Sequence, residues 1–389
     1  MLLPPHLACI VDSEIPRFSD AEMTRRRAAI EALLAEHDCD HLVFCGLNRF
    51  GSAVQWLTQW PVTAEAVGVL TPGERDALFV QWVNHAAQAR IVADNADVAW
   101  GGESSIGSAI EVLDKRGSRS GRIAYIGPLT AEQHARLSAR HPNIANLTRA
   151  YARLRQVKSA EELDWLRIGA HFSDLGMAAL RDGLKPGMNE RELGDLVERA
   201  YIAQGATNVI HYIGTTSMHA PDVGVPRQFP TTRRLQVGDA VVAEISAAFW
   251  DHPGQVLRSF ALGEPTKLYR DLHAAADAAF DAIAGVLKAG ASPAQVIEAS
   301  GVIEEAGFTI IDDLLHGYGG GYLPPILGCQ SRPAGPVPQE SFHAGQTVVI
   351  QPNVTTRDGR AGVQTGEMVL ITDSGLERLH TMPRGFLQL

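Results

Sequence analysis

The sequence lacks the features that mark secreted, membrane and nucleic-acid-binding proteins. Its four cysteines show no CxxC or metal-ligand spacing, so neither a disulfide framework nor a cysteine metal site is indicated. No run approaches the roughly 20 apolar residues that span a bilayer, and the opening residues lack the basic stretch and long apolar core of a signal peptide. No block of like charge stands out. We therefore expect a cytoplasmic protein without a nucleic-acid or membrane partner.

The sequence contains enough apolar residues to form two hydrophobic cores. Its 389 residues are 45% hydrophobic and 20% charged, with a net charge of -10. In the first part, apolar residues recur at helical spacing in 19–38, and short buried strands are predicted at 41–46 and 122–127. This alternation of helix and strand predicts an α/β domain over residues 1–155.

The pattern changes in the second part, which we expect to be a separate domain over residues 156–389. Ser159 and Glu162 form the pattern of a capping box at the start of a long amphipathic helix. The elements predicted beyond it are a second helix, strands after residue 207, helices at about 266–289 and 292–306, and closing strands in "TVVIQPNV" and "EMVLITD".

Six segments of the second part have the order and spacing found in the pita-bread family, which includes methionine aminopeptidase, prolidase, aminopeptidase P and creatinase. They are "RLRQVKSAEELDWLRIGA", "LQVGDAVVAEISAAFW", "GQVLRSFALGEPT", "LLHGYGGGYLPP", "GQTVVIQPNV" and "GEMVLITDSG". The resemblance covers nearly the whole chain and is weakest in the front domain. It implies an α+β protein in which a creatinase-like α/β N-terminal domain precedes a pita-bread catalytic domain.

The resemblance also points to a set of metal-ligand positions. Metallopeptidase members hold two divalent ions with two Asp, one His and two Glu. The corresponding residues here are Glu244, Gln255, His316, Gln351 and, last, either Gly366 or Glu367. Clear ligand character is kept at Glu244 and His316. Two divalent ions need several anionic oxygens, and amide oxygens bring no charge, so we expect no metal and no other cofactor.

Creatinase is the metal-free precedent in the family, and it hydrolyses a C–N bond of a small amidine with His and carboxylates. By this resemblance we expect a metal-independent enzyme that hydrolyses an amide, amidine or ring C–N bond of a small polar molecule. The catalytic candidates are Glu244, His316 and His219. A carboxylate in the middle of an apolar strand is costly to bury unless paired, and a raised pKa would suit acid–base catalysis. A histidine titrates near neutral pH and suits the same task.

Further residues are candidates for lining the substrate pocket. Each glutamine keeps about the size of an acid while removing its charge, and the glycine-rich setting of His316 allows close backbone approach. The candidates are Gln255, Gln351, Gln364, Glu367, Tyr318, Tyr322, Gln228, His211 and Arg258. Gln228 takes the place of the family's mobile histidine, and Leu257 that of a creatinase acid. Structural explanations also exist: a Glu244–Arg258 ion pair, a solvated His219, a paired His211 and tyrosines that only pack.

Three other functions remain open. The protein could be an aminopeptidase P or prolidase-like peptidase with one metal on Glu244, His316 and Glu367. The same pocket could serve a lyase or isomerase, because proton abstraction uses the same residue types. The protein could also bind a ligand without turning it over. The resemblance further implies a homodimer in which the N-terminal domain of one subunit, through residues 46–60, approaches the pocket of the other.

Overall fold

The computed structural model describes residues 2–117 and 121–389, and these form two compact units. One unit is Asp12–Arg155, and the other is formed by residues 2–11 together with Gln156–Leu389. The change of unit after Arg155 coincides with the boundary expected from the sequence. The first residues depart from that expectation because helix α1 (Pro5–Val11) buries Leu7 and contacts α8 of the second unit.

The first unit is an α/β sandwich around one mixed sheet. In the described residues the sheet has six strands in the order β4-β3-β2-β1-β5-β6, with β1 antiparallel to β2 and parallel to β5. The strands are β1 (His41–Leu47), β2 (Glu65–Leu70), β3 (Asp76–Val80), β4 (Ala96–Trp100), β5 (Ile123–Ile126) and β6 (Ile144–Asn146). The helices are α2 (Asp20–Glu36), α3 (Ala53–Thr58), η1 (Val83–His85), α4 (Ala86–Val92), α5 (Ser105–Arg116), α6 (Ala131–Arg140) and α7 (Thr148–Leu154).

Close packing in this sheet depends on one glycine. A Cβ at Gly68 of β2 would lie 2.0 Å from the ring of Phe44, which is fully buried on the neighbouring strand β1. The absent side chain therefore makes room for a large aromatic ring.

Most strands of the second unit form one large sheet that is antiparallel apart from one short parallel pair, and two short strands form a separate sheet. Its helices besides α1 are α8 (Ala160–Gly183), α9 (Glu190–Arg199), η2 (Ile202–Gln204), α10 (Lys267–Val286), α11 (Pro293–Ala299) and α12 (Val302–Glu305). Its strands are β7 (Thr207–Ser217), β8 (Asp239–Phe249), β9 (His252–Pro253), β10 (Val256–Ala261), β11 (Thr309–Ile310), β12 (Leu315–Tyr318), β13 (Tyr322–Leu327), β14 (Thr347–Ile350), β15 (Val354–Thr355), β16 (Gly366–Ile371), β17 (Leu376–Arg378) and β18 (Leu387–Gln388).

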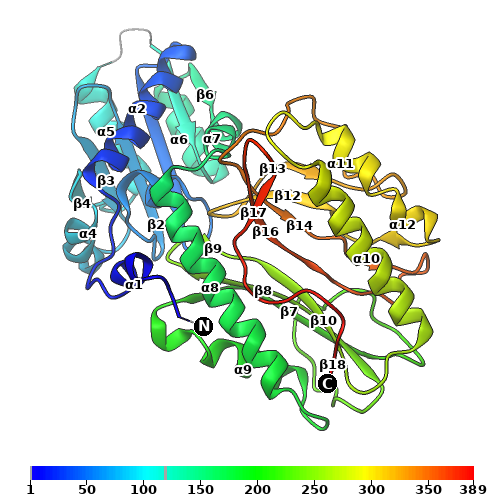
Figure 1. Ribbon diagram of the computed structural model, residues 1–389. Helices are drawn as coiled ribbons and strands as arrows, with labels where there is room; N and C mark the ends of the chain where they lie inside the picture. The colour runs from blue at the N-terminus through cyan, green and yellow to red at the C-terminus, as the bar shows by residue number, and fades with distance from the viewer. Residues whose placement is uncertain (1, 118–120) are drawn as a thin grey trace. The chain divides into compact units, whose positions relative to one another are not determined.

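The strand order brings distant parts of the sequence together. Within the described residues the main path of the sheet is β13-β12-β14-β16-β10-β8-β7, so β8 and β10 from the first half adjoin β16 and β14 from the second. Figure 1 shows α8 and α9 along the half of the sheet that contains β7 and β8, and α10 along the other half. The five expected ligand positions fall on, or directly beside, these central strands.

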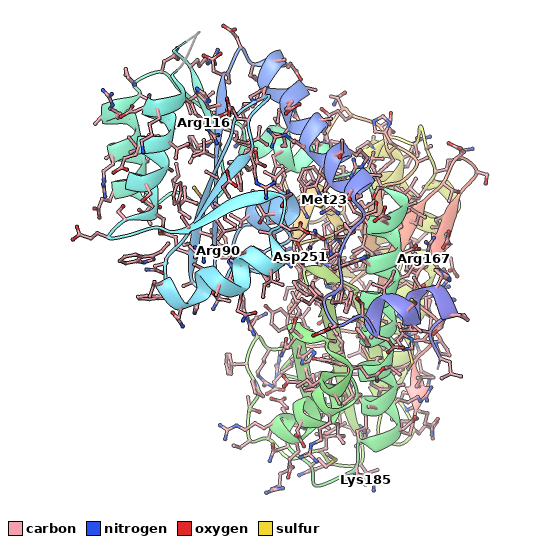
Figure 2. All side chains as sticks on the ribbon, turned by 90° about the vertical axis from the view of Figure 1, so that its left-hand side faces the viewer. Met23, Arg90, Arg116, Arg167, Lys185 and Asp251 are labelled. Atoms are coloured by element: carbon pink, nitrogen blue, oxygen red, sulfur yellow. The ribbon has the colours of Figure 1, made fainter. Side chains whose placement is uncertain are left out.

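The helix starts follow the sequence signals closely. The Ser159 hydroxyl accepts from the Glu162 N–H at 3.1 Å, and the Glu162 carboxylate accepts from the Ser159 N–H at 2.9 Å, which confirms the predicted capping box. Figure 2 follows α8 past Arg167 to Lys185, which lies just beyond its end. The helix expected at 292–306 is instead two short helices, α11 and α12, separated at Ser300 and Gly301. Among the described residues, no helix is both long and apolar enough to cross a membrane.

Candidate active site

Glu244 lies at the centre of a buried polar network. It sits in the middle of β8, a strand whose residues are all buried, and is itself 4% exposed. The Gln255 amide donates to one Glu244 oxygen at 2.6 Å, and the Gln364 amide donates to the other at 3.4 Å. Burial, with a smaller effect of the Asp312 charge, raises the pKa of Glu244 to about 7. The carboxyl group can therefore gain or lose a proton near neutral pH.

Two glutamines connect Glu244 to a second carboxyl group. The Gln255 amide nitrogen also lies 3.3 Å from the amide oxygen of Gln351, and the Gln351 nitrogen donates to Asp313 at 2.9 Å. Burial, reinforced by Asp312, raises the pKa of Asp313 to about 8. Sequence reasoning missed Asp313. The signal that could have found it is the pair of acids directly before the buried strand that carries His316.

His316 lies next to this network on β12, opposite the strand that leads into Gln351, and is completely buried. Its Nδ1 lies 3.0 Å from the carbonyl oxygen of Gly317, which puts the proton of the neutral ring on Nδ1 and leaves Nε2 as a buried acceptor without a hydrogen bond. Burial lowers the pKa of His316 to about 4, opposed in part by the Gly317 carbonyl and the Gln351 side chain. The imidazole is therefore neutral near pH 7.

The two tyrosines singled out from the sequence enclose His316. The Tyr322 ring stacks on the imidazole with 3.8 Å between ring centroids, and the Tyr318 ring meets it edge-on at 5.4 Å. Tyr318 is 1% exposed, whereas Tyr322 is 47% exposed. Tyr322 thus forms the solvent-facing cover of the histidine, and Tyr318 lies behind it.

Glu367 and Arg258 do not join this network, contrary to the expectation that they line the pocket. Both are completely buried, and they form an ion pair with each other at 2.6 Å, in which Arg378 also donates to Glu367. Although burial alone raises it, the Arg378 hydrogen bond and the Arg258 charge hold the pKa of Glu367 below its ordinary value. Neighbouring residues of a strand point to opposite faces, so Glu367 points away from the face on which Gly366 lies. The proposed Glu244–Arg258 ion pair is likewise absent between these two described residues.

Three other candidates also lie elsewhere. His211 is opposite Ile245, which places it on the other face of the sheet from Glu244, where it contacts the Tyr201 hydroxyl at 2.7 Å. His219 is exposed in the loop after β7 and lies beside Gly238, the residue directly before β8. Glu244 is five residues further along β8 than Asp239, the first residue of that strand, which corresponds to roughly 17 Å of extended chain. Gln228 is exposed in the same loop. The structure therefore does not support His219 as a catalytic residue or His211 and Gln228 as pocket lining.

The residues present do not fit a two-metal centre. Of the five ligand positions, two are held by neutral glutamines and one by Gly366, which has no side chain. A Cβ at Gly366 would lie 2.4 Å from the carbonyl oxygen of Ile350, so the backbone leaves no room for an acid there. In residues 2–117 and 121–389, no group of three or more His, Cys, Asp and Glu side chains is placed to hold a metal ion.

This packing predicts the effect of a side chain at position 366. We expect Gly366→Ala to lower the free energy of unfolding by about 1–3 kcal/mol, because the new methyl group overpacks the contact with Ile350. Gly194→Ala is the matched control: no atom lies near its Cβ position on α9, and replacement of a helical glycine should raise stability by roughly 0.5–1 kcal/mol. Urea unfolding of both variants measures the difference, and equal effects would contradict the proposed crowding.

Comparison with known proteins supports the fold and identifies the family. Residues 164–373 match the model of metallopeptidase family M24. The Xaa-Pro dipeptidase from Bacillus anthracis superposes with a TM-score of 0.80 at 17% identity, over 94% of this chain and 100% of that chain. The prolidase from Pyrococcus furiosus gives a TM-score of 0.76 at 18% identity, over 91% of this chain and 99% of that chain.

Two curated relatives match this chain over part of its length. The probable dipeptidase PepE of Mycobacterium tuberculosis is 28% identical over 245 residues, which is 59% of this chain and 60% of that protein. The Xaa-Pro dipeptidase of Pyrococcus furiosus is 23% identical over 238 residues, or 60% of this chain and 66% of that protein. With the family model covering more than half of its residues, the chain belongs to metallopeptidase family M24, and its fold is an α/β N-terminal domain followed by a pita-bread domain.

Proposed function

We propose that the protein hydrolyses an amide C–N bond of a small peptide-like molecule, with Glu244 as the proton carrier and without a dinuclear metal centre. The similarity to dipeptidases and prolidases supports a peptide-like substrate over the amidine of a creatinase-like enzyme. The observation that carries the metal-independent part is the Glu244 network: a buried acid with a pKa of about 7, held by glutamines at positions where two metal ions would need acids.

The chemistry follows from the protonation states in the network. Ionised Glu244 accepts a proton from the water molecule that attacks the carbonyl carbon, and it then delivers that proton to the nitrogen that leaves. A carboxyl group with a pKa near the working pH serves both steps. Neutral His316 accepts a hydrogen bond at Nε2 and so orients the water or the substrate.

A second candidate function is a peptidase that uses one metal ion. The similarity to a metallopeptidase family and to an Xaa-Pro dipeptidase favours this candidate. Glu244 and His316 are the residues that would hold the ion, and the acid expected to complete the set, Glu367, is bound to Arg258 instead. Lyase or isomerase chemistry, binding without turnover, and the homodimer all stay predictions.

One experiment separates these functions. The protein is purified without chelators, its metal content is measured by elemental mass spectrometry, and hydrolysis is screened with Xaa-Pro and other dipeptides and with small amidines, before and after chelator treatment and with added Mn²⁺ or Co²⁺. We expect dipeptide hydrolysis that survives chelation. Activity that chelation removes and one equivalent of metal restores would establish the second candidate instead. Saturable binding with no turnover of any substrate would identify a binding protein.

A further inference from the structure

We infer that the hydroxyl groups of Tyr318 and Ser246 form a pair of hydrogen-bond donors for the carbonyl oxygen of the substrate. The inference rests on the proposed amide hydrolysis and adds to it the residues that stabilise the developing negative charge. It also fixes the direction in which the amide group lies in the site.

The first line of evidence is that both hydroxyl groups are buried with no hydrogen-bond partner other than each other. Tyr318 is 1% exposed and Ser246 is completely buried; their hydroxyl groups interact with each other, and neither oxygen has a further hydrogen-bond partner. Buried polar groups are nearly always fully hydrogen-bonded, because an unpaired group loses the hydrogen bonds that it makes with water. A buried hydroxyl pair that is satisfied only within itself keeps hydrogen-bonding capacity for a ligand.

The second line of evidence is that these groups lie beside the catalytic candidates. Ser246 is two residues from Glu244 on β8, so both side chains point to the same face of the sheet. The Tyr318 ring is edge-on to His316 at 5.4 Å. Burial, the largest effect, raises the pKa of Tyr318 and keeps its hydroxyl protonated, and that hydroxyl forms a hydrogen bond with Ser246.

The third line of evidence is the polarity of the remaining unpaired atoms. The Gln255 and Gln364 nitrogens are engaged by Glu244, so their oxygens are left buried and unpaired. The unpaired Nε2 of His316 is also an acceptor. The site thus combines hydroxyl donors with amide and imidazole acceptors, and Gln255 lies opposite Ser246 across the strand pair. An amide fits this arrangement with its oxygen at Tyr318 and Ser246 and its N–H groups at the glutamines.

The reaction balances with the residues present. Water oxygen bonds to the carbonyl carbon, the C=O electron pair moves onto the oxygen, and Glu244 takes the proton that water loses. Tyr318 and Ser246 donate hydrogen bonds to the resulting oxyanion and keep their protons. The oxyanion then collapses, the C–N bond breaks, and Glu244 returns the proton to the nitrogen, which gives a carboxylic acid and an amine. The hydroxyl groups provide preorganised stabilisation of the charge.

The test is the substitution Tyr318→Phe, which removes the hydroxyl group and keeps the ring. With the dipeptide that wild type hydrolyses fastest, we expect kcat to fall by about 10²- to 10³-fold while KM changes by less than about threefold, as for the loss of one oxyanion donor. Because the hydroxyl pairs only with Ser246 in the free protein, Tm should fall little compared with the loss of kcat. Ser246→Ala should also lower kcat.

Tyr269→Phe is the matched control. Tyr269 is also completely buried with an unpaired hydroxyl group, but it lies on α10 in the apolar core formed with Leu272 and Phe280. The kcat of the Tyr269→Phe enzyme should equal that of wild type. A Tyr318→Phe enzyme with kcat within threefold of wild type would overturn this inference and leave the proposed function intact. If wild type hydrolyses no amide, the proposed function fails and this inference fails with it.

Discussion

Glu244→Gln is expected to abolish hydrolysis, with kcat at least about 10³-fold below wild type. The variant keeps the size of the side chain but can neither take a proton from water nor return it to the leaving nitrogen, and a positioned acid–base group contributes about 10²- to 10⁴-fold. The measurement is single-turnover hydrolysis of the best dipeptide. Gln364→Ala is a milder comparison, because it removes one hydrogen bond to Glu244 at 3.4 Å but leaves the carboxyl group in place.

The same substitution should make the folded protein more stable above neutral pH. The pKa of Glu244 rises on folding from its ordinary value of 4.5 to about 7, so the native state binds the proton more tightly than the unfolded state. The free energy of unfolding of wild type therefore falls as the pH rises from about 4.5 to about 7. At 1.36 kcal/mol per pH unit the fall amounts to about 3 kcal/mol.

Urea unfolding at pH 5 and pH 8 checks this prediction. The free energy of unfolding of Glu244→Gln should exceed that of wild type by only a small amount at pH 5 and by about 3 kcal/mol at pH 8. An advantage that does not change between these pH values would mean that Glu244 is ionised with an ordinary pKa, and the acid–base role would lose its support.

The second large effect is expected at the buried ion pair beneath the site. Glu367→Gln should lower the free energy of unfolding by about 3–5 kcal/mol, because it leaves the completely buried Arg258 without an anionic partner. The guanidinium group would keep only its bonds to backbone carbonyl oxygens, such as those of Met382 and Pro383. Thermal and urea unfolding both measure the loss.

An exposed ion pair provides the control for this effect. Lys267 and Asp271 form a pair one turn apart on α10, with the lysine side chain 82% exposed. Asp271→Asn should change stability by less than about 1 kcal/mol, since solvent screens exposed pairs. If Glu367→Gln is as mild as this control, then Glu367 is not the counter-charge that stabilises Arg258, and the arrangement of β10 against β16 must depend on other contacts.

The sequence predicted the fold and the centre of the site because both leave local signals. Capping residues such as Ser159 act within one helical turn, and the strand patterns around Glu244, His316 and Gln351 occur in a characteristic order along the chain. These signals were sufficient for the family and for the group formed by Glu244, His316 and the three glutamines. Tyr318 and Tyr322 also lie where the glycine-rich turn suggested.

The errors concern properties that sequence spacing does not encode. Whether Glu367 or Gly366 faces the site depends on the register of β16, and a shift of one residue exchanges the two faces of the strand. His219 and Gln228 are in a long loop, where proximity in sequence to β7 says little about proximity to Glu244. Asp313 reaches the network only through the Gln351 side chain, a contact between residues 38 positions apart.

Gly366 limits how readily the family's five-ligand set could be built into this protein. Recovery of the five-ligand set requires acids at Gln255, Gln351 and Gly366 together, since each acid alone would add a buried charge beside Glu244 with no ion to balance it. The last step also needs the backbone of β14 to move away from the 2.4 Å contact at Ile350. With the metal-independent function proposed above, Gly366 therefore acts as a barrier that single substitutions at the other ligand positions do not remove.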